Sequence, residues 1–222
     1  MLNEWWVALL DIIYPPRCPI CRRPVDVHGA WCPVCLAPVL AEHRLNLAGR
    51  RLAALASCQV LCDYAAGVKT LLHQLKFRGS TRAAASLAWL LAARPDGLRL
   101  HGIQAVVPVP LHPGRLTERG YNQTELIFRR WSERQGWPWL DVLIRTRPTA
   151  PQWELVPAER RRNVRGAFAL THPDAIRGKT ILLVDDIVTT GATMNECAKV
   201  LRRGGAARVL GLALAGSPYT GR

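Results

Sequence analysis

Residues 181–193, Ile-Leu-Leu-Val-Asp-Asp-Ile-Val-Thr-Thr-Gly-Ala-Thr, constrain the fold more than any other part of the chain. The first four residues are apolar, as in a short strand buried on both faces of a parallel sheet. Asp185 and Asp186 follow at the carboxyl end of that strand, and a polar loop containing Gly191 comes next. Residues 194–203 then repeat apolar side chains at helical spacing. The stretch therefore predicts a strand, a loop and a helix in that order.

The loop has the composition of a phosphate-binding site. Gly191 lets the backbone approach a ligand, successive N–H groups can point into one concavity, and the positive end of the following helix favours an anion. Thr189, Thr190 and Thr193 add hydroxyl donors. Carboxylates repel a phosphate, so the two preceding acids are expected to face sugar hydroxyls or a metal ion. A phosphorylated sugar satisfies both halves. The alternative is an ordinary strand-to-helix loop whose acids are solvated.

Two C-x-x-C pairs near the N-terminus supply four cysteines, Cys18, Cys21, Cys32 and Cys35. At this spacing four thiolates can bind a tetrahedral Zn²⁺, and because no coordination position stays open the metal is expected to be structural. A module this small lacks the core to fold without such a metal. Two redox pairs or buried thiols are the alternative, and whether the ribbon contacts nucleic acid or protein is left open.

The remaining pattern predicts three regions: residues 1–37 with a helix over 4–13 and the four-cysteine ribbon, a linker at 38–57, and a main domain over 58–222. The first helix packs on its own domain or binds a partner or a membrane surface. Strands are expected at 58–64, 105–110, 142–145, 166–170 and 208–215, and helices near 68–75, over 81–93 and from 122 to about 135. Residues 111–122 are expected to form a loop. In a parallel sheet that loop lies at the same edge as the two acids.

The chain is strongly basic, with a formal net charge of +14 from 30 basic and 16 acidic residues. Such a balance favours a polyanionic partner or substrate. Arginine predominates over lysine and suits phosphate, although a GC-rich genome produces the same bias. The basic run at 160–165 is either a solvated surface or part of a functional segment. No apolar run approaches membrane-spanning length, and acids stand where a secretory signal carries Lys or Arg, so a cytoplasmic location is expected.

Residues 181–193 resemble the phosphoribosyl pyrophosphate signature of type I phosphoribosyltransferases. In that family the paired acids hold the ribose 2′ and 3′ hydroxyls and the threonine-rich loop binds the 5-phosphate. The resemblance thus assigns Asp185 and Asp186 to the ribose. It assigns to the phosphate the loop residues Thr189, Thr190, Gly191, Ala192 and Thr193. The whole chain resembles the ComF-type proteins, phosphoribosyltransferase homologues associated with competence and use of external DNA. The matching parts are the four cysteines, 75–79, 107–111, 119–123, the Arg160/Asn163/Phe168 stretch and the signature.

The resemblance implies an α/β fold: a type I phosphoribosyltransferase-like parallel sheet flanked by helices, with a small N-terminal four-cysteine zinc ribbon. It places Pro110, Leu111 and His112 over the pyrophosphate, with Arg115 or the catalytic candidate Arg119 nearby. Lys76 and Arg160 lie in matching segments and are further candidates for substrate contact, and residues 147–165 correspond to a flexible hood.

The same resemblance implies three alternatives for function. A transferase would bind phosphoribosyl pyrophosphate with Mg²⁺ and pass phosphoribose to an unidentified acceptor, with no general base assignable. A sensor would bind the same ligand without turnover. A DNA-uptake factor would bind single-stranded DNA or a helicase partner.

Overall fold

The computed structural model describes residues 11–40, 43–93, 100–148 and 157–217. Within them the main sheet has five strands in the order β1-β2-β7-β6-β3. The strands are β1 (His43–Arg44), β2 (Ser57–Asp63), β3 (Ala105–Pro108), β6 (Thr180–Val188) and β7 (Arg208–Gly216). β2, β7, β6 and β3 pair in parallel, and only the short β1 pairs antiparallel, with β2. The parallel sheet expected from the buried apolar runs is confirmed.

Strand β6 is longer than its apolar run indicated. It extends to Val188 and stays paired with β7 to its end, where Val188 is opposite Gly216. Asp185 and Asp186 therefore lie within the strand and not after it, which corrects the expected strand end. Backbone pairing does not depend on side-chain polarity, so two carboxylates do not stop the ladder while the partner strand continues.

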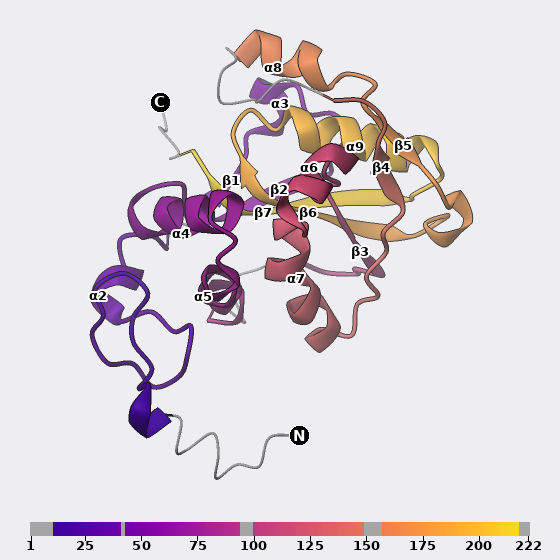
Figure 1. The fold of residues 1–222 in the computed structure, drawn as a ribbon. Coiled ribbons are helices and arrows are strands. Elements are labelled where there is room, and N and C mark those ends of the chain that lie inside the picture. Colours follow the sequence, from indigo (N-terminus) through magenta and orange to yellow (C-terminus); the bar gives the residue numbers. More distant parts are fainter. Residues whose placement is uncertain (1–10, 41–42, 94–99, 149–156, 218–222) are drawn as a thin grey trace.

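Helices cover both faces of the sheet (Figure 1). On one face α9 (Ala192–Arg203) packs on the strands, and α8 (Pro157–Val164) and α3 (Leu47–Arg50) lie outside it. On the other face lie α4 (Ala66–Phe77), α5 (Thr81–Ala92) and α7 (Gln123–Arg134). The Asn122 side chain accepts the N–H of Thr124 at 3.0 Å, which confirms the predicted start of α7. Ser80 precedes α5 as predicted, but its side chain makes no capping hydrogen bond.

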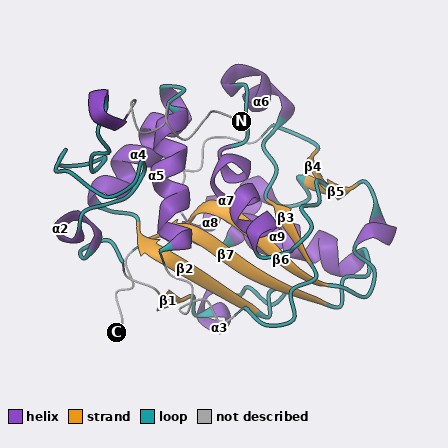
Figure 2. Ribbon diagram, turned by 90° about the horizontal axis from the view of Figure 1, so that it is seen from below, coloured by secondary structure: helices purple, strands orange, loops and turns teal. Residues whose placement is uncertain are grey.

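Smaller elements complete the described chain: α2 (Pro33–Leu36), α6 (Pro113–Arg119), β4 (Leu143–Arg145), β5 (Phe168–Leu170) and a 3₁₀ turn, η2 (Pro173–Ala175). β4 and β5 form an antiparallel pair beside the main sheet, as Figure 2 shows. Of the segment expected as a hood, residues 149–156 lie outside the described residues. Most of the remainder is α8, which carries the basic run.

Residues 43–55 lie within 38–57, the segment expected to be a linker. They form β1 and α3, and Leu45, Leu52 and Leu55 are buried in the core beside α9. Elements of two to four residues are too short to show a period, so burial here depends on the sheet edge against which the segment folds. The structure gives this segment a packing role and a place near the site.

The expected loop at 111–122 contains the helix α6, which is a second correction. The helix begins at Pro113 after His112, whose Nδ1 accepts the N–H of Gly114 at 3.2 Å, and Gly120 ends it with φ of 77°. Proline at the first helical position and glycine just past the end are helix boundary signals. The same two residue types are also common in loops, so by themselves they do not distinguish a loop from a short helix.

The four-cysteine module packs against α4 and α5 through Trp31. That side chain is 3% exposed, and its Nε1 donates to the Ser86 carbonyl oxygen at 2.9 Å. Most of the helix expected over residues 4–13 lies outside the described residues, although 11–13 are helical. Across the described ranges, no helix combines the length and apolar character needed to cross a membrane.

Candidate functional site

The two acids of β6 face opposite sides of the sheet. Side chains alternate along a strand, and in β6 Ile181 and Leu183 pack toward α9 whereas Leu182 and Val184 pack toward α4 and α7. Asp185 continues the first set and Asp186 the second, and both are buried, at 9% and 4% exposed. The Asp186 N–H donates to Asp185 Oδ1 at 2.9 Å. Strand β6 thus places one carboxylate on each face of the sheet.

Asp185 lies in an environment that opposes its negative charge. Burial raises the pKa of this carboxyl group well above its ordinary value, and the neighbouring charge of Asp186 raises it further, while Lys76 lowers it. Burial also raises the pKa of the Cys58 thiol to about 12, with the charge of Asp185 as the second cause. A ligand that donates hydrogen bonds to Asp185 would stabilise its charged form.

On the other face, Asp186 is paired with Lys76 at the end of α4. Lys76 Nζ lies 2.5 Å from Asp186 Oδ2, with the two side chains 19% and 6% exposed. The next residue, Phe77, has the Arg119 guanidinium 5.5 Å from its ring centroid, and the Tyr121 hydroxyl donates to the Leu75 carbonyl oxygen at 2.5 Å. The structure therefore joins segments 75–77 and 119–121 beside the acid pair.

Arg119 is held at the end of α6. Its Nη1 donates to Gln123 Oε1 at 3.2 Å. Burial lowers the pKa of Arg119, the positive charge of Arg115 lowers it further, and Asp186 opposes both. The group stays cationic at neutral pH because arginine starts from so high a pKa. Arg119 thus lies close enough to Arg115 and Asp186 for both charges to affect its pKa.

Residues of the segment that was expected to be a linker contact the predicted phosphate loop. Gly191 precedes α9 with φ of 78°, a conformation that favours glycine, and a Cβ there would lie 2.5 Å from Leu52 Cδ1, so the leucine side chain would have to move. Arg50 Nη1 donates to the Thr189 carbonyl oxygen. Within the loop, the Ala192 N–H donates to Thr190 Oγ1 at 3.3 Å. Arg50 of α3 thus binds the backbone carbonyl oxygen of Thr189 in the loop.

Two arginines of this region were missed by reasoning from the sequence. Arg50 lies where no period was visible, so no signal pointed to it. Arg145 had a signal: it shares a strand face with the buried Leu143, and a charged residue on such a face is unusual. Its guanidinium lies 5.4 Å from the Phe168 ring centroid, and burial, followed by the charge of Arg115, lowers its pKa.

Arg145 also lines a cavity of about 150 Å³ with His112 and Arg115, residues that sequence reasoning placed near the pyrophosphate. Pro110 and Leu111 lead into it, both half-buried. Arg160, in contrast, is carried by α8, which packs on α9. The structure thus gathers His112, Arg115 and Arg145 around one cavity, and Arg145 comes from β4.

The four predicted metal ligands come together. Their Sγ atoms, one each from Cys18, Cys21, Cys32 and Cys35, all lie within 4.8 Å of one another. Although burial raises the pKa of Cys18, backbone N–H donors of Cys21, Cys32 and Ile20 lower it to about 6, whereas burial and the neighbouring cysteines raise the pKa of Cys35 to about 12. Four thiolates at this separation fit tetrahedral Zn²⁺.

Comparison with known families agrees with this geometry. Residues 147–216 match the family described as "Phosphoribosyl transferase domain", and residues 9–62 match "Double zinc ribbon domain". The parallel sheet, the acid pair and the glycine loop at the start of α9 define a protein with the type I phosphoribosyltransferase fold, joined to a four-cysteine zinc ribbon.

Relatives match over most of the chain. DNA utilization protein YhgH of Escherichia coli (strain K12) is 37% identical over 202 residues, which cover 86% of each protein. Competence protein F of Haemophilus influenzae is 30% identical over 199 residues, covering 85% of this chain and 79% of the relative. Adenine phosphoribosyltransferase from Leishmania tarentolae has a TM-score of 0.41 and 11% identity, covering 78% of this chain and 94% of the other. On the sequence relatives, the chain belongs to the ComF family of competence and DNA utilization proteins.

Proposed function

We propose that this protein binds phosphoribosyl pyrophosphate and transfers its phosphoribosyl group to a nitrogen acceptor, with release of pyrophosphate. The observation that carries the proposal is the passage, within one strand, from two adjacent buried carboxylates to a glycine loop at the start of α9. Carboxylates accept hydrogen bonds from sugar hydroxyls, and N–H groups at a helix start bind phosphate. One ligand that carries both groups is a ribose 5-phosphate.

In this assignment Asp185 and Asp186 accept hydrogen bonds from the ribose 2′ and 3′ hydroxyls. Lys76 offsets the charge of Asp186, and hydrogen bonds from the ribose hydroxyls would favour the ionised form of Asp185. The backbone from Thr189 to Thr193 binds the 5-phosphate. Arg50 binds the Thr189 carbonyl oxygen, which helps to fix the conformation of the loop that would receive the phosphate.

The reaction breaks the bond between C1 of the ribose and the pyrophosphate oxygen, and both electrons of that bond leave with the pyrophosphate. The lone pair of the acceptor nitrogen forms the new bond to C1, and the nitrogen then loses a proton. His112, Arg115 and Arg119 are the residues proposed to stabilise the leaving charge, and Arg145, which lines the same cavity as His112 and Arg115, adds a further guanidinium group. Mg²⁺ would enter bound to the substrate and neutralise part of its charge.

Water has to be excluded from C1 while that carbon is cationic. We assign this role to the hood, residues 147–165, which includes α8 and Arg160. No residue is assigned as general base, because the acceptor that would lose the proton is unidentified.

Titration calorimetry with phosphoribosyl pyrophosphate and Mg²⁺ tests the binding half of the proposal, and an assay of pyrophosphate release with candidate acceptors tests the transfer half. Binding followed by acceptor-dependent release supports the transferase. Binding without release with any acceptor supports a sensor that uses the same pocket. The absence of binding would contradict the assignment of the acid pair and the loop.

A second candidate function is the handling of DNA, through single-stranded DNA itself or a helicase partner. It is favoured by the net charge of +14 and by the names of the relatives, one a DNA utilization protein and one a competence protein. Its test is DNA binding measured at several salt concentrations, because affinity that arises from phosphate contacts falls steeply as salt rises.

A further inference from the structure

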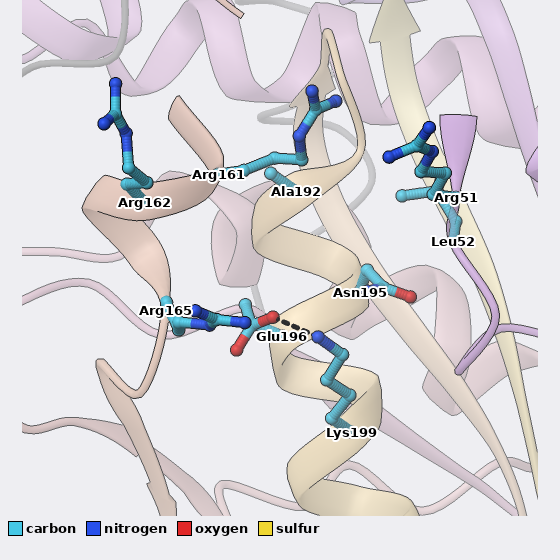
Figure 3. Close-up of a pocket in the computed structure, with 9 residues that line it drawn as sticks. All are labelled: Arg51, Leu52, Arg161, Arg162, Arg165, Ala192, Asn195, Glu196 and Lys199. Carbon is cyan, nitrogen blue, oxygen red and sulfur yellow. Dashed lines mark hydrogen bonds and ion pairs between the residues drawn. The ribbon is translucent and has the colours of Figure 1, made fainter. Parts of the chain in front are cut away.

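A basic groove lies on the outer face of α9, and its charged side chains are given no contact with the ligand in the reaction proposed above. We call it the α9 groove. It encloses about 440 Å³, with α9 as its floor, α8 as one wall and the segment after α3 as the other (Figure 3). α9 lines it with Asn195, Glu196 and Lys199, whereas Met194, Cys197 and Leu201 of the same helix pack toward the sheet. The helix therefore separates the groove from the acid pair of β6.

The groove carries a large excess of positive charge. Its cationic side chains are Arg51, Arg161, Arg162, Arg165 and Lys199, and Glu196 is its one carboxylate. Glu196 is already occupied, because its Oε1 lies 2.6 Å from Lys199 Nζ. Among the residues that the structure describes, no ion pair involves the four arginines of the groove. Cations gathered without acidic partners repel one another, and a bound anion relieves that repulsion.

The lining of the groove selects the kind of anion. It has no aromatic side chain, and its apolar residues, Leu52 and Ala192, are both buried, at 2% and 5% exposed. A nucleobase would find no stacking surface there, and an apolar ligand would find little to bury against. The planar guanidinium group of arginine can donate two parallel hydrogen bonds to phosphate oxygens. The groove therefore fits phosphate groups whose attached sugars and bases stay outside it.

The arrangement of the arginines favours an extended ligand. Arg161 and Arg51 point toward each other above Ala192, Arg165 lies beside Glu196 further along α9, and Arg162 points away from the helix (Figure 3). The positive charge thus runs along the groove and out onto the surface of α8. A hollow of about 440 Å³ is far smaller than a duplex, so one strand can enter it, whereas the convex outer surface of a duplex would reach only the rim.

We propose that the α9 groove binds the phosphate groups of a single-stranded nucleic acid. This inference rests on the second candidate function and is independent of phosphoribosyl transfer. The groove begins at Ala192, which also belongs to the predicted phosphate loop, and its Arg51 follows Arg50, which contacts that loop. The strand would therefore lie outside the site, next to the phosphate end of the smaller ligand.

The test uses the full-length zinc-loaded protein and a fluorescently labelled oligothymidine of about 15 nucleotides, with binding followed by fluorescence anisotropy. One double variant, Arg161→Glu with Arg165→Glu, alters the wall formed by α8. A second, Arg51→Glu with Lys199→Glu, alters the opposite wall and the floor. The matched control is Arg130→Glu with Arg134→Glu, which reverses two exposed arginines of α7 on the opposite face of the sheet. All three variants have the same net charge.

We expect each groove variant to lose about tenfold or more in affinity near 100 mM salt, and the control less than about threefold. For each groove variant the salt slope should also fall by about 1.4, since each phosphate contact on a single strand contributes about 0.7. An equal loss in the control would mean that net charge alone attracts the strand, and would overturn the proposal. A duplex that binds as tightly as the single strand would also overturn it.

Inorganic tripolyphosphate is the competitor. If it displaces the oligonucleotide at equal phosphate concentration, the groove is a site for small anions and the proposal is wrong. Zinc content and thermal melting show whether each variant is folded, and Arg161→Ala with Arg165→Ala replaces the first variant if charge reversal unfolds it. Titration of the unaltered protein with phosphoribosyl pyrophosphate is a separate measurement, so failure of either proposal can be told from failure of the other.

Discussion

Lys76 Nζ lies 2.5 Å from Asp186 Oδ2, and this ion pair joins the end of α4 to strand β6 in a largely buried position. Breaking a buried pair by removing one partner leaves a charge without compensation. We expect Lys76→Met to lower the free energy of unfolding by about 3 kcal/mol, measured by urea denaturation.

A double variant separates this electrostatic effect from lost packing. Lys76→Met combined with Asp186→Asn leaves no unpaired charge, so it should recover most of the stability that Lys76→Met alone loses. If the double variant is no more stable than the single one, the carboxylate does not depend on the lysine. Lys69→Met, at an exposed lysine of the same helix, is the matched control and should change stability little.

Asp185→Asn should make the protein more stable near neutral pH and unable to bind phosphoribosyl pyrophosphate. The pKa of Asp185 is raised in the folded protein, chiefly by burial. The folded state then binds more protons than the unfolded state, so stability falls as pH rises from about 4, the unfolded value, through the folded pKa. An amide has no charge to bury, and its oxygen can still accept the Asp186 N–H.

Melting temperature measured from pH 4 upward checks this prediction. The gain of the variant should be small near pH 4 and increase with pH, and a gain that is the same at every pH would contradict the role of the carboxyl proton. Asp185→Asn with Asp186→Asn should also stay folded and show no binding in calorimetry. Unchanged affinity of that double variant would refute the ribose assignment.

Arg50→Ala should weaken phosphoribosyl pyrophosphate binding by about tenfold and leave the fold intact. The guanidinium donates to the Thr189 carbonyl oxygen, so its loss removes one charge-assisted hydrogen bond, worth about 1.5–3 kcal/mol, from the loop that would bind the phosphate. Arg44→Ala, an exposed arginine on β1, removes the same charge without that contact. Equal loss in both variants would show that only long-range charge is involved.

Cys18→Ser or Cys32→Ser should lose about one equivalent of zinc per chain and destabilise the N-terminal module. Metal content measured by atomic emission, with limited proteolysis of the same samples, gives the two readouts. Cys62→Ala is the control, because Cys62 is buried in the core and lies outside the four-cysteine cluster. Full zinc content in the serine variants would rule out a site of four thiolates.

Local sequence determined those features that depend on neighbouring residues. The apolar run at 181–184 gave a buried parallel strand, Gly191 gave the turn into α9, and Asn122 gave the start of α7, because each depends on backbone preferences that act over a few residues. The cysteine spacing likewise brought four sulfur atoms together. Pro113 and Gly120 led to the prediction of a loop where the structure has α6, because each residue type is compatible with both a loop and a helix boundary.

Only the tertiary structure decided which distant side chains meet at these features. Nothing within residues 43–55 indicates that Arg50 binds the Thr189 carbonyl oxygen or that Leu52 packs on Gly191, because both contacts follow from how the segment folds against the sheet edge. The pairing of Lys76 with Asp186 also depends on the placement of α4, as the groove between α8 and α9 depends on how those helices pack. The sequence supplies the charges and the turns, and the packing of helices on a shared sheet sets the distances between them.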